Sequence, residues 1–391
     1  MSHAAPANNV DCYGRHENVG LYKQARDPAA PTRYNWVMSL RTLAFSVFCA
    51  GCVWAQTYTV MPINPPDGYT WGGVRSISGS RLITGTVVDA GGHVRAVVAS
   101  QSGSAVLPLL AGWPNAQGIS INNVGQVAGF AQDASRMNNV AFVGSAEMGV
   151  SAIPMPPGWT SSGAGGINSS GLVAGGGGDG VQSQAFIGTA SGITLIPLPA
   201  GWAAAGASAI NDFGVVTGNG TDPAGSVPFY GTVSSITAVP MPVGWSNVVS
   251  IGINNAGVIV ANGTNTAYQR QAYIYTIGGA ITLVPLPPGA TSAENPLAIN
   301  NSNAVIGNGD AGEWIWTRDC GTLLLNALVP SGWSVRSVNA INDDGVLAAY
   351  VQYNGGAVQV AELIPSVPTA RDAEARENLG RRPQKRCFAT P

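Results

Sequence analysis

Residues 207–218 carry the pattern on which the fold depends: Ala207-Ser208-Ala209-Ile210-Asn211-Asp212-Phe213-Gly214-Val215-Val216-Thr217-Gly218. An apolar segment ends at an Ile-Asn pair, a turn closes at Gly214, and a second apolar segment begins. Asn side chains close turns by bonding to their own backbone, and Gly supplies the positive φ that such turns need. The stretch therefore predicts two short strands joined by a tight turn.

The Ile-Asn-x-x-Gly motif recurs along the chain at a regular interval. Complete copies begin at Ile121, Ile167, Ile210, Ile253 and Ile341, and degenerate copies begin at Ile77 and Ile299. Successive isoleucines are separated by 44, 46, 43, 43, 46 and 42 residues. Repeats of this length that hold four short strands are typical of propeller blades, whereas the rungs of a β-helix are shorter.

The rest of each copy supplies the second, third and fourth strands. An Asn-Gly pair, as at Asn219-Gly220 and Asn262-Gly263, predicts the second turn. An Ala-Phe element such as Ala185-Phe186 predicts the third strand, and a proline-containing element such as Ile193–Pro199 predicts the fourth. Proline suits an outer strand because no neighbouring strand needs its missing N–H.

The two ends of the repeat region complete one blade between them. Thr57–Met61 is a lone fourth strand, and Val338–Ile341, Gly345–Tyr350 and Val358–Leu363 are three strands without a fourth. Pairing between these pieces would hide both sheet edges. We therefore predict an all-β fold, a seven-bladed β-propeller of four-stranded blades over residues 56–368, with ring closure shared between the N- and C-terminal strands.

The pattern Ile-Asn-x-x-Gly-x-Val-x-Gly, followed by Ala-Phe, resembles the bacterial extracellular HAF-repeat family from about Gln56 to Leu363. The resemblance implies export and a propeller-like fold, and it implies no particular chemistry. The chain departs from the family pattern in two respects. No histidine precedes any Ala-Phe pair, and the C-terminal segment lacks a Pro-Glu-Pro sorting signal.

Both ends of the chain lie outside the repeats. Residues 1–37 form a polar, aperiodic leader, and residues 38–55 combine a basic start, an apolar core and a Val-x-Ala site, the parts of a secretory signal. The apolar run is too short to span a bilayer. Residues 369–391 are charged and predict a disordered tail. We expect a monomeric mature chain that starts near Gln56 and is secreted or periplasmic.

The composition of the repeat region excludes several kinds of partner. Between Gln56 and Pro368 there are seven Arg, no Lys and fourteen acidic residues, which give a net charge of −7 and a poor match for nucleic acid. The region holds one histidine, His93, and one cysteine, Cys320. We therefore expect no multi-histidine metal site and no cofactor. Cys320 is expected to be a lone buried thiol, with pairing to Cys387 as the alternative.

Alignment of the copies on the Ile anchor places two kinds of side chain in rings. Aromatic residues stand eight positions before the anchor: Tyr69, Trp113, Trp159, Trp202, Trp245 and Trp333. Acids and their equivalents stand about twelve positions after it: Asp89, Asp133, Asp179, Asp222, Asn265 and Asp310. In an up-and-down blade, the two connections that hold these rings emerge on the same face.

Each ring has a structural and a functional interpretation. A Trp in every repeat packs blade against blade, and Asp is an ordinary former of turns. As binding residues, the rings would offer aromatic platforms and acidic acceptors to a glycan, or oxygen ligands to Ca²⁺. The chain has no Asp-x-Asp-x-Asp-Gly loop, which disfavours calcium.

Two functions follow from these interpretations. The first is an exported, non-enzymatic scaffold that binds a glycan, a cell-envelope polymer or a protein on one rim. The alternative is a propeller hydrolase or lyase, whose candidate groups are Asp133, Asp179, Asp222, Arg75, Arg95, Arg270 and Glu294. An acid–base pair needs carboxylates in unlike environments, and symmetry-related turns offer like ones, so the scaffold is favoured.

One further motif, a glycine-rich one, does not have the structural context that its usual function requires. Gly175-x-Gly177-x-x-Gly180 matches a dinucleotide-binding fingerprint. The fingerprint needs a helix after it, and here a strand is predicted, so no nucleotide is expected.

Overall fold

The structure is a computed structural model that describes residues 57–292 and 295–366. The predicted leader, secretory signal and charged tail at residues 1–37, 38–55 and 369–391 lie outside these ranges, as does Glu294. The described residues form β-strands and one short 3₁₀ helix, Leu325–Ala327, with no helix able to cross a membrane among them.

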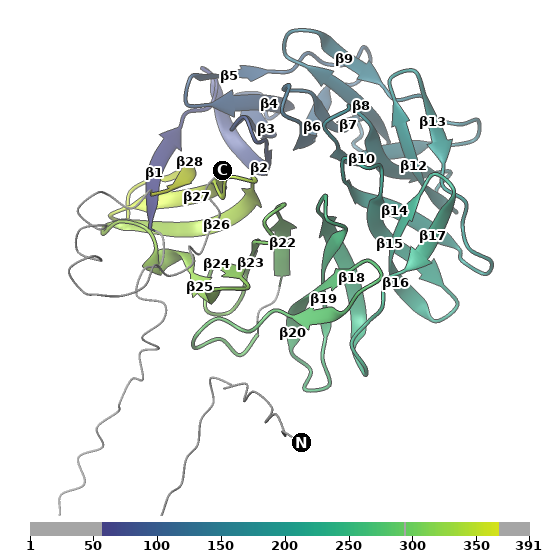
Figure 1. The fold of residues 1–391 in the computed structure, drawn as a ribbon. Helices are drawn as coiled ribbons and strands as arrows, with labels where there is room; N and C mark the ends of the chain where they lie inside the picture. The colour runs from purple at the N-terminus through teal and green to yellow at the C-terminus, as the bar shows by residue number, and fades with distance from the viewer. Residues whose placement is uncertain (1–56, 293–294, 367–391) are drawn as a thin grey trace, which may run out of the picture. The chain divides into compact units, whose positions relative to one another are not determined.

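Seven four-stranded antiparallel sheets surround a common axis (Figure 1). Six of them are built from strands consecutive in the chain, and we number these blades in chain order. The first three blades are β2 (Tyr69–Ile77), β3 (Ile83–Asp89), β4 (Val94–Ser100) and β5 (Gly103–Val106); β6 (Asn115–Ile121), β7 (Val127–Gln132), β8 (Asn139–Ser145) and β9 (Gly149–Ala152); and β10 (Ser161–Ile167), β11 (Val173–Gly178), β12 (Ser183–Thr189) and β13 (Gly192–Leu195). The fourth to sixth blades are β14 (Ala204–Ile210), β15 (Val216–Asp222), β16 (Gly225–Thr232) and β17 (Ser235–Ala238); β18 (Ser246–Ile253), β19 (Val258–Thr264), β20 (Arg270–Thr276) and β21 (Ile281–Leu283); and β22 (Asn295–Ile299), β23 (Val305–Asn308), β24 (Trp314–Thr317) and β25 (Gly321–Leu324).

The seventh blade joins the two ends of the repeat region. It holds β26 (Trp333–Ile341), β27 (Leu347–Tyr353) and β28 (Val358–Pro365), with β1 (Tyr58–Ile63) as its outermost strand. β1 pairs with β28 from Tyr58 opposite Pro365 to Ile63 opposite Val360. The predicted all-β, seven-bladed propeller with shared closure is confirmed.

The hydrophobic core lies between neighbouring blades. Phe186 of the third blade, for example, packs with Ala128, Ala141 and Ile153 of the second. Each blade therefore buries its apolar face against the next one and depends on its neighbours, as repeat architectures do.

Two predictions about strand ends are wrong. Asn219-Gly220 and Asn262-Gly263 lie within β15 and β19 and do not form turns, whereas the same prediction at Asn308-Gly309 is confirmed, since β23 ends at Asn308 and Gly309 begins the turn. The Asn219 side chain instead binds the next blade, with Nδ2 donating to the Ser250 carbonyl at 3.0 Å and Oδ1 accepting from the Ser250 N–H at 2.9 Å. From within β15, this asparagine therefore links two blades.

The prolines of the fourth strand lie beyond it. β13 ends at Leu195, so Pro197 and Pro199 belong to the connection that follows. There the Trp202 N–H donates to the Pro199 carbonyl at 3.1 Å, and Gly201 has φ 86°. This is the geometry of a type II turn, which requires glycine at its third position.

The repeated asparagine joins the blades into a circle. The Asn211 Oδ1 atom closes its own turn by accepting the Val215 N–H at 3.0 Å. The amide Nδ2 of each ring member donates to the backbone carbonyl of its equivalent in the next blade: Asn122 to Asn168 (3.2 Å), Asn168 to Asn211 (3.2 Å), Asn211 to Asn254 (3.1 Å), Asn254 to Asn300 (3.0 Å), Asn300 to Asn342 (3.0 Å) and Asn342 to Ser78 (3.1 Å). All of these residues are buried, so each bond satisfies a polar group that is shielded from water.

The first blade departs from this pattern. Ser78 has no amide to donate, and Arg81 stands where the Ile-Asn-x-x-Gly motif has glycine, with φ 63°. The Arg81 guanidinium forms an ion pair with Glu362, which is completely buried in β28 of the seventh blade. The interface between the first and seventh blades thus has a charge pair that the repeat motif does not supply elsewhere.

Cys320 is disulfide-bonded, and its partner lies outside the described residues. The prediction of a lone buried thiol is therefore wrong, because the sulfur is bonded and the residue is only half-buried, in the turn between β24 and β25. Residues 319–321 form this turn at the surface, where a second chain segment can reach the sulfur.

Candidate functional site

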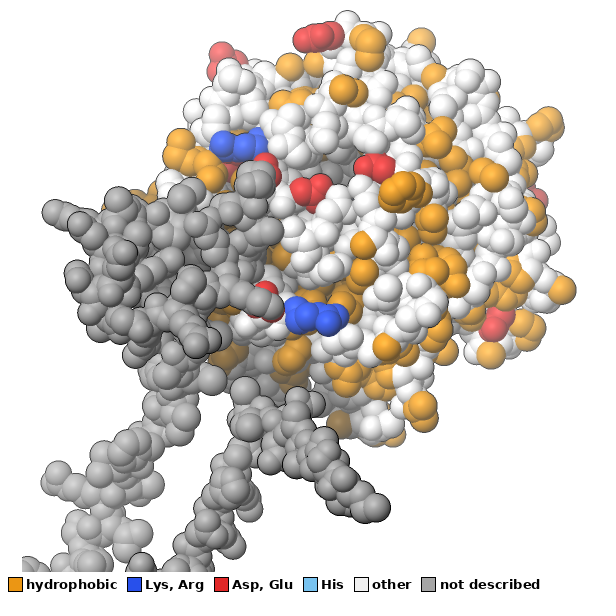
Figure 2. All heavy atoms as spheres, in the orientation of Figure 1, with side chains coloured by type: hydrophobic (Ala, Val, Ile, Leu, Met, Phe, Trp, Pro, Cys, Tyr) orange, Lys and Arg blue, Asp and Glu red, His pale blue; other side chains and the backbone are white. Residues whose placement is uncertain are grey.

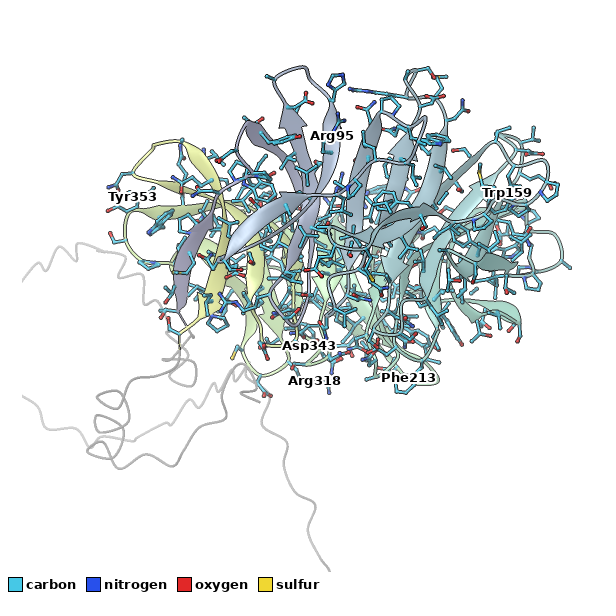
Figure 3. All side chains as sticks on the ribbon, turned by 90° about the horizontal axis from the view of Figure 1, so that it is seen from above. Arg95, Trp159, Phe213, Arg318, Asp343 and Tyr353 are labelled. Atoms are coloured by element: carbon cyan, nitrogen blue, oxygen red, sulfur yellow. The ribbon has the colours of Figure 1, made fainter. Side chains whose placement is uncertain are left out.

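The blades present two kinds of turn to two opposite faces. Turns after the first and third strands of each blade emerge on one face, which we call the Asn face. Turns after the second strand and the connections between blades emerge on the other, which we call the Trp face. Figure 3 shows Arg95, Trp159 and Tyr353 on the Trp face, and Phe213, Arg318 and Asp343 on the Asn face.

The aromatic ring lies on the Trp face and packs inside the blades. Trp202 meets Phe229 edge-on with ring centroids 6.2 Å apart, and Trp245 meets Tyr273 at 5.6 Å. The same kind of contact joins Trp159 to Phe186 and Trp333 to Tyr353, while Trp113 packs on the cluster around Phe142. The six ring aromatics, Tyr69 included, are half-buried.

Glycines in the second strands make room for these indoles. A Cβ atom added to Gly220 would approach the Trp202 ring to 2.2 Å, and one added to Gly177 would approach Trp159 to 2.3 Å. Such distances are not compatible with a side chain, so each indole covers bare backbone. Contact with the Trp159 indole explains why residue 177 is glycine, and no bound nucleotide is needed to account for it. The geometry therefore favours the packing interpretation of the six ring aromatics. The binding role remains a prediction.

The acidic ring lies on the same face, and its carboxylates close turns. Asp179 Oδ1 accepts the N–H groups of Val181 and Gln182, both at 2.8 Å. Side-chain oxygens accept backbone N–H groups in the same way at Asp89, Asp133, Asp222 and Asn265, whereas Asp310 binds Thr291 of the preceding connection. These oxygens are already engaged, which disfavours both calcium binding and general acid–base chemistry.

The same hydrogen bonds shift the titration of the ring. The pKa is held below its usual value by the His93 N–H at Asp89, by the Ser135 hydroxyl at Asp133 and by the Gln182 N–H at Asp179. A hydrogen bond to the charged form favours that form. Asp89, Asp133 and Asp179 are therefore ionised at neutral pH.

Acidification should reveal this contribution. We expect the thermal unfolding midpoint to fall as pH decreases from about 5 to about 2.5. A carboxylate whose pKa is lower in the folded state stabilises the fold fully above its pKa in the unfolded chain, about 3.9. This stabilisation is lost as pH falls further, through the folded-state pKa. Asp133→Asn removes one titrating group and keeps the turn chemistry that Asn265 shows. The variant should lose less stability over this range, and an identical loss would contradict the assignment.

The other candidate catalytic residues that the structure describes lie in the first and fifth blades. In the first blade, Asp89 Oδ2 lies 3.1 Å from His93 Nδ1 and 3.6 Å from an Arg95 Nη atom. Arg75 is exposed on β2, and Arg270 is the first residue of β20 in the fifth blade. Glu313 is buried, and burial raises the pKa of its carboxyl while the Val338 N–H, at 3.0 Å, opposes that shift. Glu313 lines neither of the cavities described below, and the described residues contain no cluster of three potential metal ligands.

A groove opens on the Trp face between the third and fourth blades. It encloses about 480 Å³ and is lined by β10, β11 and the start of β14. Glycines form much of its wall: Gly163, Gly176, Gly177, Gly178, Gly180 and Gly206. Val181, at the tip of the turn after β11, borders it and is 89% exposed.

The groove has room because the third repeat has glycine, at Gly176, where each of the other repeats has a side chain. Gly176 occupies the β11 position that Phe130 occupies in β7 and Asn219 in β15. Across the interface it meets Gly206 of β14, and a Cβ atom added to Gly206 would have no heavy atom within 4 Å. Sequence reasoning missed this site, although comparing the aligned repeats would show the missing side chains.

A second cavity, of about 190 Å³, is the mouth of the central channel on the Asn face. The Ile-Asn pairs of six blades and Ile77-Ser78 of the first line it, and the residues that follow them form an outer tier: Gly79, Asn123, Ser169, Asp212, Asn255, Asn301 and Asp343. Figure 2 shows acidic side chains around this hollow. Asp212 and Asp343 accept hydrogen bonds from neighbouring turns, at 2.9 Å from the N–H groups of Ser169 and Asn301.

The chain is thus an all-β propeller whose fold has relatives among solved structures. It is 10% identical to the β-propeller domain of the Trilobed protease from Pyrococcus furiosus, with a TM-score of 0.49 and coverage of 79% of this chain and 94% of that one. A virginiamycin B lyase from Staphylococcus aureus is 13% identical, with a TM-score of 0.44 and coverage of 80% and 100%. YCF48 bound to a D1 peptide is 10% identical, with a TM-score of 0.45 and coverage of 80% and 98%.

Likeness at this level carries no activity to the present chain. No family model and no curated protein matches it. The resemblance to HAF repeats therefore stays a prediction, and function has to be argued from the surface itself.

Proposed function

We propose that this protein is an exported, non-enzymatic scaffold whose Trp face binds a partner protein, with an extended apolar segment of that partner seated in the groove between the third and fourth blades. The glycine-lined groove carries this proposal. A wall of bare backbone admits a chain closely, and a cavity of about 480 Å³ accommodates a few side chains.

The surroundings of the groove support a protein partner over a glycan. Turn tips on the same face expose large apolar side chains: Met137 (79%), Val181 (89%), Val243 (98%) and Tyr268 (92%). These side chains add apolar surface to the Trp face, which an apolar segment of a partner protein can contact. Glycan recognition would rely on accessible aromatic faces, and the ring tryptophans turn toward glycines and other aromatics within their own blades.

Two further observations support a scaffold outside the cytosol. The ring carboxylates are engaged in turns, so the enzyme alternative lacks an available acid–base pair. The disulfide at Cys320 suits an oxidising compartment, since reduced thiols prevail in the cytosol.

The proposal is tested by filling the groove. Gly206→Val adds a side chain where no atom lies within 4 Å of the new Cβ, and Gly206 does not have a positive φ, so the fold should be kept. A displayed library of twelve-residue peptides is selected on the full chain. We expect enrichment of apolar, extended peptides whose affinity falls at least about tenfold on Gly206→Val, because the groove is then occupied.

The matched control is Gly192→Val, which also has open space around its Cβ and lies at the start of β13 on the Asn face. It should bind the selected peptides as the wild type does. Equal binding to all three proteins, or enrichment on a glycan array in place of the peptide library, would contradict the proposal.

A further inference from the structure

The groove lies at one of three interfaces between blades that share a feature of sequence. At each of them the innermost strand of the following blade has glycine four residues before its Ile anchor: Gly73, Gly163 and Gly206. The second strand of the preceding blade contributes its fourth residue to the same interface, which is Tyr350, Phe130 and Gly176 in the same order. The interface between the third and fourth blades is thus the one of the three that lacks an aromatic ring.

At the other two interfaces the protein seats an aromatic ring of its own. A Cβ atom added to Gly163 would have Phe130 Cδ1 as its nearest neighbour, at 3.9 Å, an ordinary van der Waals contact. Tyr350 is likewise half-buried, and it packs on the cluster that contains Val74, the residue after Gly73. Each ring therefore covers backbone that carries no side chain and removes apolar surface from water.

The corresponding space beside Gly206 is empty. A Cβ atom added to Gly206 has no heavy atom within 4 Å, and both Gly206 and Gly176 line the groove of about 480 Å³. The groove therefore includes the volume that an aromatic ring fills at the interface between the second and third blades. A flat ring can lie against backbone without Cβ atoms, whereas the branched side chain of leucine is held further from it.

A buried hydroxyl group of the groove independently points to a ligand. Ser162 lines the groove and is only 5% exposed. Its Oγ atom accepts the Ala141 N–H at 3.0 Å, and no residue within 57–292 and 295–366 accepts the hydroxyl hydrogen. Buried donors are normally paired, so this hydrogen calls for an acceptor from the occupant of the groove.

We propose that the partner segment is anchored by a phenylalanine or tyrosine side chain, which takes the place beside Gly206 that Phe130 takes beside Gly163. A backbone carbonyl of the same segment accepts the Ser162 hydroxyl. This inference rests on the proposed function, because it names the residue type that the groove selects. The ring supplies most of the buried area, and the single polar contact fixes the direction of the segment. One interface between blades is thus completed by another protein.

The anchor is tested with the twelve-residue peptides selected on the full chain. Peptides whose affinity falls on Gly206→Val should share one phenylalanine or tyrosine. Leucine in place of that residue should weaken binding at least about tenfold in fluorescence anisotropy, because the ring contact is lost. The change is made in the peptide, so the fold of the protein is not affected. Leucine in place of another apolar residue of the peptide is the control and should have a smaller effect.

The polar contact is tested by Ser162→Ala, which should weaken the same peptides about fivefold, as the loss of one neutral hydrogen bond does. The matched control is Ser145→Ala, because Ser145 is also buried and its Oγ atom also accepts a backbone N–H, that of Met148 at 3.0 Å, but on the Asn face. It should leave the affinity unchanged. Peptides with an ester in place of each amide in turn, which weakens one carbonyl acceptor at a time, give the same test on the unaltered protein.

The outcomes separate this inference from the proposed function. Peptides that depend on Gly206 but contain no aromatic residue, or that bind equally well with leucine in its place, would overturn the anchor and leave the groove as the binding site. Unchanged affinity for Ser162→Ala and for every ester peptide would overturn the carbonyl contact. If no selected peptide depends on Gly206, the proposed function fails and the anchor fails with it.

Discussion

Replacement of Arg81 by glycine is expected to lower the free energy of unfolding by about 3 kcal/mol, although glycine relieves the positive φ of 63° at that position. The change leaves Glu362, which is completely buried, without its charged partner. An uncompensated buried charge is among the costlier defects a fold can carry. The stability of the purified variant is measured by urea denaturation against the wild type.

The second half of this experiment restores the repeat consensus. The third blade, for example, has glycine where Arg81 stands and an aliphatic residue where Glu362 stands, at Gly171 and Ile187. Arg81→Gly combined with Glu362→Ile should therefore recover most of the wild-type stability, since replacing both members of a buried pair is often neutral. If the double variant is no more stable than Arg81→Gly, the pair does not explain the loss.

Trp202→Ala is expected to cost about 3 kcal/mol, as large-to-small changes at packed aromatic sites do. The indole covers Gly220 and contacts Phe229, so its removal leaves a cavity beside bare backbone. Urea denaturation of the variant should show a clearly lower midpoint with an unchanged slope.

The control for this prediction is Tyr268→Ala, an aromatic of the same face that is 92% exposed. It should change stability by no more than about 0.5 kcal/mol. A similarly small effect of Trp202→Ala would contradict the packing role and favour accessible aromatics as binding platforms.

The architecture was predictable because it follows from the regular spacing of the repeated motifs. The interval between the Ile anchors defines the blade, and the unmatched strands at Thr57–Met61 and Val358–Leu363 predict the shared closure, which the structure confirms in β1 and β28. Predictions from single dipeptides were less reliable. Asn219-Gly220 was assigned to a turn, but its amide binds Ser250 in another blade, a contact that local sequence does not encode.

The surface was less predictable than the fold, for a physical reason. Repetition draws attention to residues that recur, such as Trp202 and Asp179, and recurring residues here mostly stabilise blades and turns. The groove depends on a side chain that the third repeat lacks, at Gly176, and the ion pair depends on a side chain that the first repeat adds, at Arg81. Departures from the consensus are therefore the better guide to sites in this chain.

The circle of asparagine amides has a gap between the first and second blades, where Ser78 donates no amide. The Gly79 N–H donates to Asn123 Oδ1 there, as the Ser169 N–H does to Asp212 between the third and fourth blades, and the exposed Ser80 hydroxyl donates to the Asn123 carbonyl. Exposed bonds compete with water, so the Ser80 bond makes up for only part of the missing amide link. The interface between the seventh and first blades keeps both an amide link and the Arg81–Glu362 pair. The circle is thus complete beside the blade in which β28 and β1 join the two ends of the repeat region, and its gap lies one interface further on, where the backbone connects the two blades directly.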